Sequence, residues 1–122
     1  MKTVSTQNAH AAIGPYSQGK IVGELVFVSG QIPVDPATGA VAEGIEAQTE
    51  QSCKNVAAVL EAAGSSMEKV VKTTCFVADM GDFARFNGVY EKHFISKPAR
   101  SCVAAKALPK GVLCEIEAIA EL

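Results

Sequence analysis

Residues 45–77, IEAQTEQSCKNVAAVLEAAGSSMEKVVKTTCFV, change from a helical pattern to a strand pattern and so determine the centre of the fold. From Ile45 to Ala63, apolar side chains recur every three or four residues, which places them on one face of a helix. Gly64 suits the end of that helix as a C-terminal cap. The run Ser65 to Glu68 resembles a short capping box. The β-branched run Val70 to Val77 then predicts a strand.

Upstream of this stretch, two short apolar runs predict a hairpin. Lys20 to Val22 and Leu25 to Ser29 flank Gly23-Glu24, a pair suited to a tight turn. Asp35 to Gly39 is a strong turn signal, because its Pro fixes one φ angle and its Gly accepts a positive one. The first residues are polar, and we expect His10 to lie in a mobile N-terminus.

Downstream, the spacing of aromatic residues predicts a second helix. Asp79 or Asp82 is suited to cap its first turn. Pro98 ends this helix and biases Lys97 toward an extended backbone. The apolar face of the helix consists of Phe83, Phe86, Tyr90 and Phe94.

Two more strands are predicted near the C-terminus. They cover Arg100 to Ala105 and Val112 to Ala120, with a turn at Pro109-Lys110-Gly111 between them. The resulting order, β-β-α-β-α-β-β, indicates an α+β fold in which the helices lie on one face of a sheet. The length of 122 residues and the absence of a repeat or linker favour a single domain over residues 1–122.

The composition indicates a core that is apolar but shallow. Apolar residues make up 48% of the chain, yet 19 of them are alanines and none is tryptophan. Alanine buries little area, so we expect the chain to complete its burial against copies of itself. The formal net charge of −2 argues against a dedicated nucleic-acid binder, which would usually carry a basic face.

The sequence contains no pattern typical of a metal site, an export signal or a membrane span. The four cysteines lie far apart, as do His10 and His93, whereas a zinc site needs close pairs of ligands. No apolar run approaches the roughly 18 residues of a membrane span, and the N-terminus has no signal-peptide core. We therefore expect a cytosolic protein whose thiols are reduced and buried as small hydrophobes.

The strongest candidates for chemistry are two carboxylates and one guanidinium. Strand alternation places Glu115 and Glu117 on one face, where they either meet water or provide one carboxylate that handles a proton. Arg100 is the only cation at the start of an apolar strand, and its guanidinium is shaped to grip a carboxylate. The alternative is a structural ion pair between Arg100 and Glu115 or Glu117.

Weaker signals come from loops and from the second helix. Ser29-Gly30 follows a strand and is either a backbone nest for a ligand or a simple strand end. Tyr16 is either a packing plug or a wall of a site, and Asn87 is either a structural bridge or a ligand contact. A Cys–His nucleophile pair, a two-histidine ribonuclease site and a glycine-rich phosphate loop are all disfavoured.

Several blocks of the sequence together form a distinctive set that extends over about residues 10–120. The blocks are Ile13 to Gln18, Ser29 to Pro33, Asp35-Pro36 with Thr38-Gly39, Val71 to Thr74, Met80 to Tyr90, Pro98 to Val103 with Lys106 and Leu108, and Glu115 to Ala118. In this combination they resemble one known family, the RidA/YjgF reactive-intermediate deaminases, also known as the L-PSP endoribonucleases.

The resemblance implies a chorismate-mutase-like mixed sheet with two helices on one face and a homotrimer with a barrel core. It implies hydrolysis of 2-imino acids, such as 2-iminobutanoate and 2-iminopropanoate, to 2-oxo acids and ammonia in clefts between subunits. It also implies that no metal or organic cofactor is needed. The alternatives are an L-PSP-type endoribonuclease that inhibits translation, and a non-catalytic trimer that binds small ligands or acts as a chaperone.

The resemblance also assigns roles to individual residues. Arg100 would hold the substrate carboxylate with help from the backbone of Cys102, and Glu115 would orient water or move a proton. The chain departs from the family at Lys97, where an aromatic or apolar residue often stands, and in the segment from Tyr90 to Pro98, which is shorter than in many relatives. The substrate preference therefore stays open. Cys114 replaces a branched aliphatic residue. The pocket would be lined by Tyr16, Ser29, Gly30 and Asn87.

Overall fold

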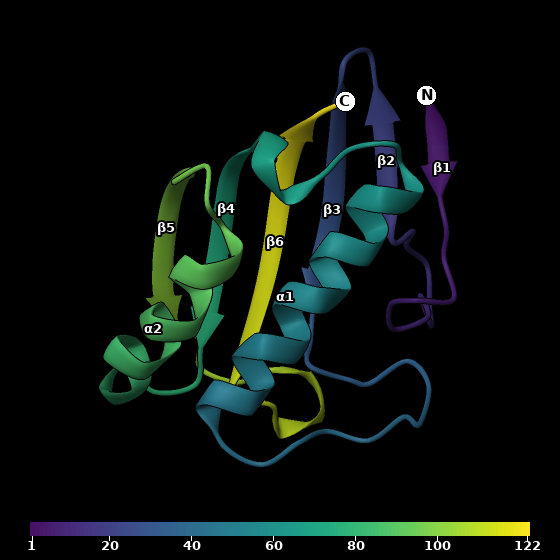
Figure 1. The fold of residues 1–122 in the computed structure, drawn as a ribbon. Helices are drawn as coiled ribbons and strands as arrows, with labels where there is room; N and C mark the ends of the chain where they lie inside the picture. Colours follow the sequence, from purple (N-terminus) through teal and green to yellow (C-terminus); the bar gives the residue numbers. More distant parts are fainter.

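A single six-stranded sheet with two helices on one face makes up the fold (Figure 1). A computed structural model describes all residues from Met1 to Leu122. The strands lie in the order β1-β2-β3-β6-β4-β5. Their bounds are β1 Lys2–Val4, β2 Gly19–Val22, β3 Leu25–Gln31, β4 Val70–Val77, β5 Ala99–Ala104 and β6 Cys114–Glu121; the helices are α1 Ile45–Ala62 and α2 Phe83–His93.

The predicted α+β class, with both helices on the same face, is confirmed. The β4–β5 pair is parallel because α2 carries the chain back between the two strands, and every other pair is antiparallel. β1 was not predicted, because three residues are too few to show a periodicity. It is formed by pairing with β2, in which Lys2 lies opposite Ile21. Neither helix combines the length and the apolar character needed to cross a bilayer.

Helix α1 ends as the glycine pattern predicts. Gly64 has a φ of +86°, its N–H donates to the Glu61 carbonyl, and the Ser65 N–H donates to the Leu60 carbonyl. These two bonds satisfy the last turn in a Schellman motif. The predicted capping box at Ser65 to Glu68 is wrong: Ser66 makes no capping bond, and the Ser65 hydroxyl donates instead to the Glu121 carbonyl of β6.

Helix α2 begins at Phe83 as predicted but ends earlier than predicted. The Asp79 carboxylate accepts from the Gly81 N–H and so caps a short 3₁₀ turn over Met80–Asp82 that leads into α2. The helix ends at His93, well before Pro98. Lys97 is not extended but left-handed, with a φ of +52°. The proline excludes the right-handed helical region for its predecessor, yet the left-handed one remains accessible, and the Lys97 N–H donates to the Phe94 carbonyl.

The core lies between the helices and the inner face of the sheet. Cys53 of α1, Cys75 of β4 and Cys114 of β6 are fully buried and unpaired, as small hydrophobes would be. Burial raises the pKa of the Cys75 thiol to about 12, which keeps it protonated. Cys102 of β5 is only half-buried, so the expectation of burial is wrong for this one thiol.

The segment before β2 is tied to the body of the protein. The buried Gln18 side chain donates to the His10 carbonyl at 2.9 Å and to the Thr6 carbonyl at 3.0 Å. Its own carbonyl accepts from the Thr6 N–H at 2.7 Å. The expectation of a loose N-terminus around His10 is therefore wrong, and the loop is held where it can line a cavity.

Candidate active site

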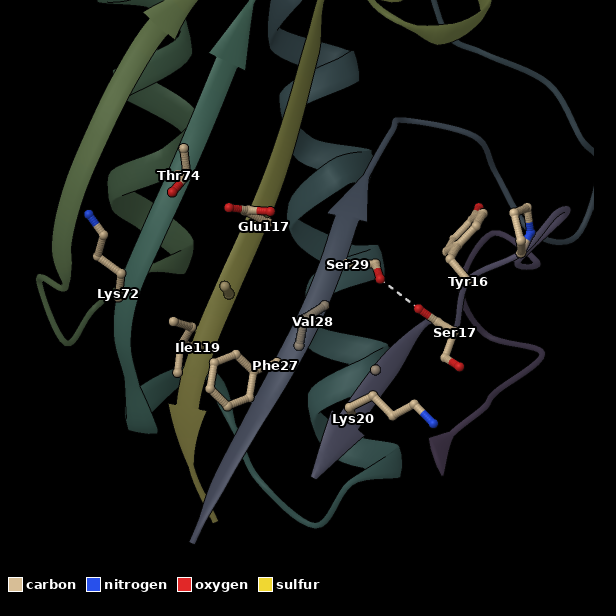
Figure 2. Close-up of a pocket in the computed structure, with 13 residues that line it drawn as sticks. Tyr16, Ser17, Lys20, Phe27, Val28, Ser29, Lys72, Thr74, Glu117 and Ile119 are labelled. Carbon is tan, nitrogen blue, oxygen red and sulfur yellow. Dashed lines mark hydrogen bonds between the residues drawn. The ribbon is translucent and has the colours of Figure 1, made fainter. Parts of the chain in front are cut away.

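The two carboxylates of β6 lie on the face of the sheet that no helix covers. Cys114, Ile116 and Ala118 are buried on the helix side, whereas Glu115 is half-buried and Glu117 is exposed, so the predicted alternation is confirmed. Figure 2 looks onto the open face, with the helices behind the sheet and Glu117 lying between β3 and β4.

A bulge in β3 brings the backbone of Gly30 against Glu115. The register of β3 on β6 shifts between Val28 and Gln31, which leaves Ser29 and Gly30 out of the regular ladder. The Ser29 hydroxyl donates to the Ser17 carbonyl at 2.6 Å and holds the bulge against the preceding loop (Figure 2). A Cβ atom on Gly30 would lie 2.0 Å from Oε2 of Glu115, so only glycine admits the carboxylate in this place.

This carboxylate stands in a cavity of about 600 Å³, which we call the carboxylate cavity. It brings together Tyr16, Ser29, Gly30 and Glu115, four of the residues that the sequence suggested. The sequence reasoning missed two basic residues of the lining, His10 and Lys110. The full lining is His10, Ile13, Tyr16, Ser29, Gly30, Gln31, Ile32, Pro109, Lys110, Glu115 and Glu117.

The surroundings of Glu115 favour its protonated form. Burial raises the pKa of the Glu115 carboxyl above its ordinary value, and repulsion from the Glu117 carboxylate raises it further. A carboxyl shifted in this direction exchanges a proton closer to neutral pH, which suits a general base or acid. The pKa of His10 is lowered, first by burial and then by the Lys110 charge, so its imidazole is mostly neutral at neutral pH.

Arg100 of β5 lies on the helix side of the sheet, against α2. Its guanidinium carbon is 4.8 Å from the centroid of the Tyr90 ring and 5.4 Å from that of Phe83. Its Nη1 donates to the Asn87 side-chain oxygen at 2.7 Å. None of the ion pairs of the structure includes Arg100, so the alternative of a structural pair with Glu115 or Glu117 is wrong within one chain.

A second cavity of about 600 Å³, which we call the arginine cavity, opens beside this guanidinium. It lies between the C-terminal part of α2 and the start of β5, and the left-handed Lys97 contributes to its wall. Cys102 follows Arg100 by two residues on β5 and therefore points to the same side of the sheet. The lining consists of Asn87, Tyr90, Glu91, Phe94, Ile95, Lys97, Pro98 and Arg100.

The two cavities are separate in a single chain. They share no lining residue, and Arg100 faces the helices while Glu115 faces away from them. β4 lies between β5 and β6 and separates the two side chains further. One copy of the chain therefore places Arg100, with Asn87 and Cys102, on one side of the sheet and Glu115, with Tyr16, Ser29 and Gly30, on the other.

Comparisons with known proteins agree with these motifs. The family model described as Endoribonuclease L-PSP matches residues 6–122. A Salmonella typhimurium protein named 2-iminobutanoate/2-iminopropanoate deaminase is 57% identical over 98% of this chain and 96% of its own length. Its namesake from Escherichia coli K12 is 53% identical over the same shares.

Two solved structures from Escherichia coli share the fold closely. The YjgF gene product superposes with a TM-score of 0.96 at 51% identity, covering 99% of this chain and 98% of that one. TdcF with bound serine superposes with a TM-score of 0.96 at 46% identity, covering 100% of this chain and 99% of that one. With the family model matching nearly the whole length, the chain belongs to the RidA/YjgF family, whose model is described as Endoribonuclease L-PSP.

Proposed function

We propose that this protein hydrolyses reactive 2-imino acids, including 2-iminobutanoate and 2-iminopropanoate, to 2-oxo acids and ammonia. The observation that carries the proposal is the state of Arg100, a guanidinium held by an amide and two rings with no carboxylate of its own chain as partner. Such a group is prepared to bind the carboxylate of a small acid. The names of relatives at 53% and 57% identity support the same substrate class.

The reaction needs little beyond orientation and the transfer of both protons of one water molecule to the imine nitrogen. Arg100 binds the substrate carboxylate, and the backbone of Cys102 on the same strand helps to hold that carboxylate. Glu115 takes a proton from water as the oxygen attacks the imine carbon, and it returns this proton to the nitrogen to give a carbinolamine. The carbinolamine hydroxyl then loses its proton through Glu115 to the same nitrogen as the C–N bond breaks, which leaves the 2-oxo acid and ammonia. The raised pKa of Glu115 suits both halves of this transfer.

The other proposed site residues serve these two groups. Tyr16, Ser29 and Gly30 line the carboxylate cavity around Glu115. Asn87 was expected to line the pocket, and its bond to Arg100 gives it the role of orienting the guanidinium. We propose that residues 1–122 form one catalytic domain.

We further propose that the active form is a homotrimer whose sites each take Arg100 from one copy and Glu115 from its neighbour. The separation of the two cavities within one chain supports this division, because neither half alone can bind and hydrolyse the substrate. The open face of the sheet supports association, since Leu25, Phe27 and Val103 are 36%, 42% and 48% exposed there. Phe27 and Ile119 lie side by side on this face in Figure 2. Burying these apolar side chains against a copy is favourable.

The test uses imine generated in place by threonine dehydratase. The rate of imine loss is followed through 2-oxobutanoate or through semicarbazone formation, for the wild type, Arg100→Ala and the control Arg85→Ala. Arg85 is an exposed arginine of the same region whose guanidinium pairs with Asp82. We expect acceleration by the wild type and Arg85→Ala and a loss of at least about a hundredfold in Arg100→Ala.

Two results would contradict the proposal. If the wild type does not accelerate imine loss, the proposed deaminase activity is contradicted. Cleavage of RNA that survives Arg100→Ala and repeated purification would instead favour the endoribonuclease named in the description of the family model.

A further inference from the structure

The face of one aromatic ring supports the guanidinium of Arg100. The guanidinium carbon lies 4.8 Å from the Tyr90 centroid, closer than to Phe83 at 5.4 Å. Tyr90 is only 7% exposed, so this contact is screened from water and is stronger than the same contact on a surface. A free arginine side chain populates many rotamers, and each partner of Arg100 reduces that number.

Tyr90 is itself held from several sides. Its hydroxyl is hydrogen-bonded to the hydroxyl of Thr73 at 2.7 Å, and Thr73 of β4 is the register partner of Arg100 on β5. Its ring stacks on that of Phe94, with centroids 4.4 Å apart, and the Phe86 ring lies 5.7 Å away along α2. The ring is therefore fixed both by its own helix and by the strand next to the one that carries the guanidinium.

We propose that Tyr90 is a positioning residue for Arg100 and that its ring face sets the orientation in which the guanidinium binds the substrate carboxylate. The ring occupies one face of the guanidinium, and Asn87 takes an N–H of Nη1. The other N–H groups of Arg100 stay free for two parallel bonds to a carboxylate at the arginine cavity. The inference rests on the proposed function, in which Arg100 holds that carboxylate.

The test compares two substitutions of Tyr90 with one in the core beneath α1. Tyr90→Leu removes the ring face, and Tyr90→Phe keeps it without the hydroxyl. Val59→Ala is the control, because Val59 is fully buried on α1 near Gly19 of β2 and lines neither cavity. Binding of the product 2-oxobutanoate is measured by isothermal titration calorimetry, and kcat and KM are measured with 2-iminobutanoate. Tyr90→Met, which keeps the volume, replaces Tyr90→Leu if the latter does not fold.

We expect the dissociation constant and KM to rise about tenfold in Tyr90→Leu or Tyr90→Met, with a smaller change in kcat. Tyr90→Phe should bind within about twofold of the wild type, because phenylalanine presents the same ring face. Val59→Ala should lower the Tm and leave the dissociation constant unchanged, which separates positioning from a general loss of packing.

Three results would overturn the inference: wild-type binding by the ringless variants, weak binding by Tyr90→Phe, or equal weakening in Val59→Ala. The proposed function is tested separately, by the activity and binding of the wild type. A wild type that binds 2-oxobutanoate but does not deaminate the imine contradicts the proposed function only, and the comparison of variants still decides the role of Tyr90. A wild type that neither binds nor deaminates contradicts both.

Discussion

Replacing Gly30 with alanine perturbs Glu115 without touching its chemistry. The added Cβ would lie 2.0 Å from Oε2 and 2.8 Å from Cδ of Glu115, whereas ordinary contacts begin at 3.4 Å. The carboxylate oxygen must therefore move by about 1.4 Å, and misplacing a reacting group by about 1 Å can cost a factor of about 100. We expect kcat/KM for 2-iminobutanoate to fall about a hundredfold, equal to about 2.7 kcal/mol of transition-state stabilisation.

The fold should tolerate this change. The obstructing atoms are the far end of a flexible side chain, and the φ angle of Gly30 is not in the left-handed region. We expect the free energy of unfolding in urea to change by less than about 1 kcal/mol. Gly88→Ala in α2 is the matched control, because its Cβ would meet nothing within 4 Å and alanine favours a helix by about 1 kcal/mol.

The assay is the coupled imine-hydrolysis measurement, with kcat and KM determined separately and with circular dichroism to check folding. The double variant Gly30→Ala, Glu115→Gln should be no slower than Glu115→Gln alone, because both changes disable the same group. A folded Gly30→Ala protein with wild-type kcat/KM would refute the reasoning, since it would mean that the position of the Glu115 carboxylate is irrelevant to the rate.

Further predictions follow from the charges and the core. Glu117→Gln removes the repulsion that helps to raise the pKa of Glu115, so the acid limb of the pH profile of kcat/KM should move to lower pH; an unmoved limb contradicts this. The hydrogen bond from His93 lowers the pKa of Glu50, so this pair should stabilise the fold at neutral pH. The pair is partly exposed, so it should contribute less than about 1 kcal/mol to the free energy of unfolding. This contribution should be lost as the pH falls through the lowered pKa of Glu50, and the loss, measured by urea unfolding at several pH values, should be absent in His93→Gln. Leu60→Ala in the fully buried face of α1 should cost about 2–5 kcal/mol of unfolding free energy, and a cost under 1 kcal/mol would contradict the packing described.

Most of the secondary structure could be predicted because local periodicity determines it. The apolar spacing of α1 and the alternation along β6 each identify a buried face from neighbouring residues alone. Features that depend on residues far apart in the sequence were not predicted. The β1 strand exists through its pairing with β2, and the left-handed Lys97 depends on a bond to the Phe94 carbonyl.

Most of the suggested site residues line one of the two cavities, but the sequence did not predict how those cavities are arranged. The family motifs pointed to Arg100 and Glu115. The residues next to each of them in the sequence do not indicate that the two side chains lie on opposite faces of the sheet. His10 and Lys110 were missed because loops bring them to the carboxylate cavity, and Gln18 fixes the path of one of those loops. The role of Gly30 emerged only from the approach of Glu115 across two paired strands.

Complementation between two inactive variants tests most directly whether the site is shared. Arg100→Ala and Glu115→Ala each lack one half, and equal amounts are unfolded together and refolded, or co-expressed, to form mixed trimers. If each site takes Arg100 from one copy and Glu115 from another, random mixing restores about one quarter of the sites, and about one quarter of the wild-type rate of 2-iminobutanoate hydrolysis returns. Mixtures that stay as inactive as the separate variants, in trimers shown to be mixed, would contradict the account.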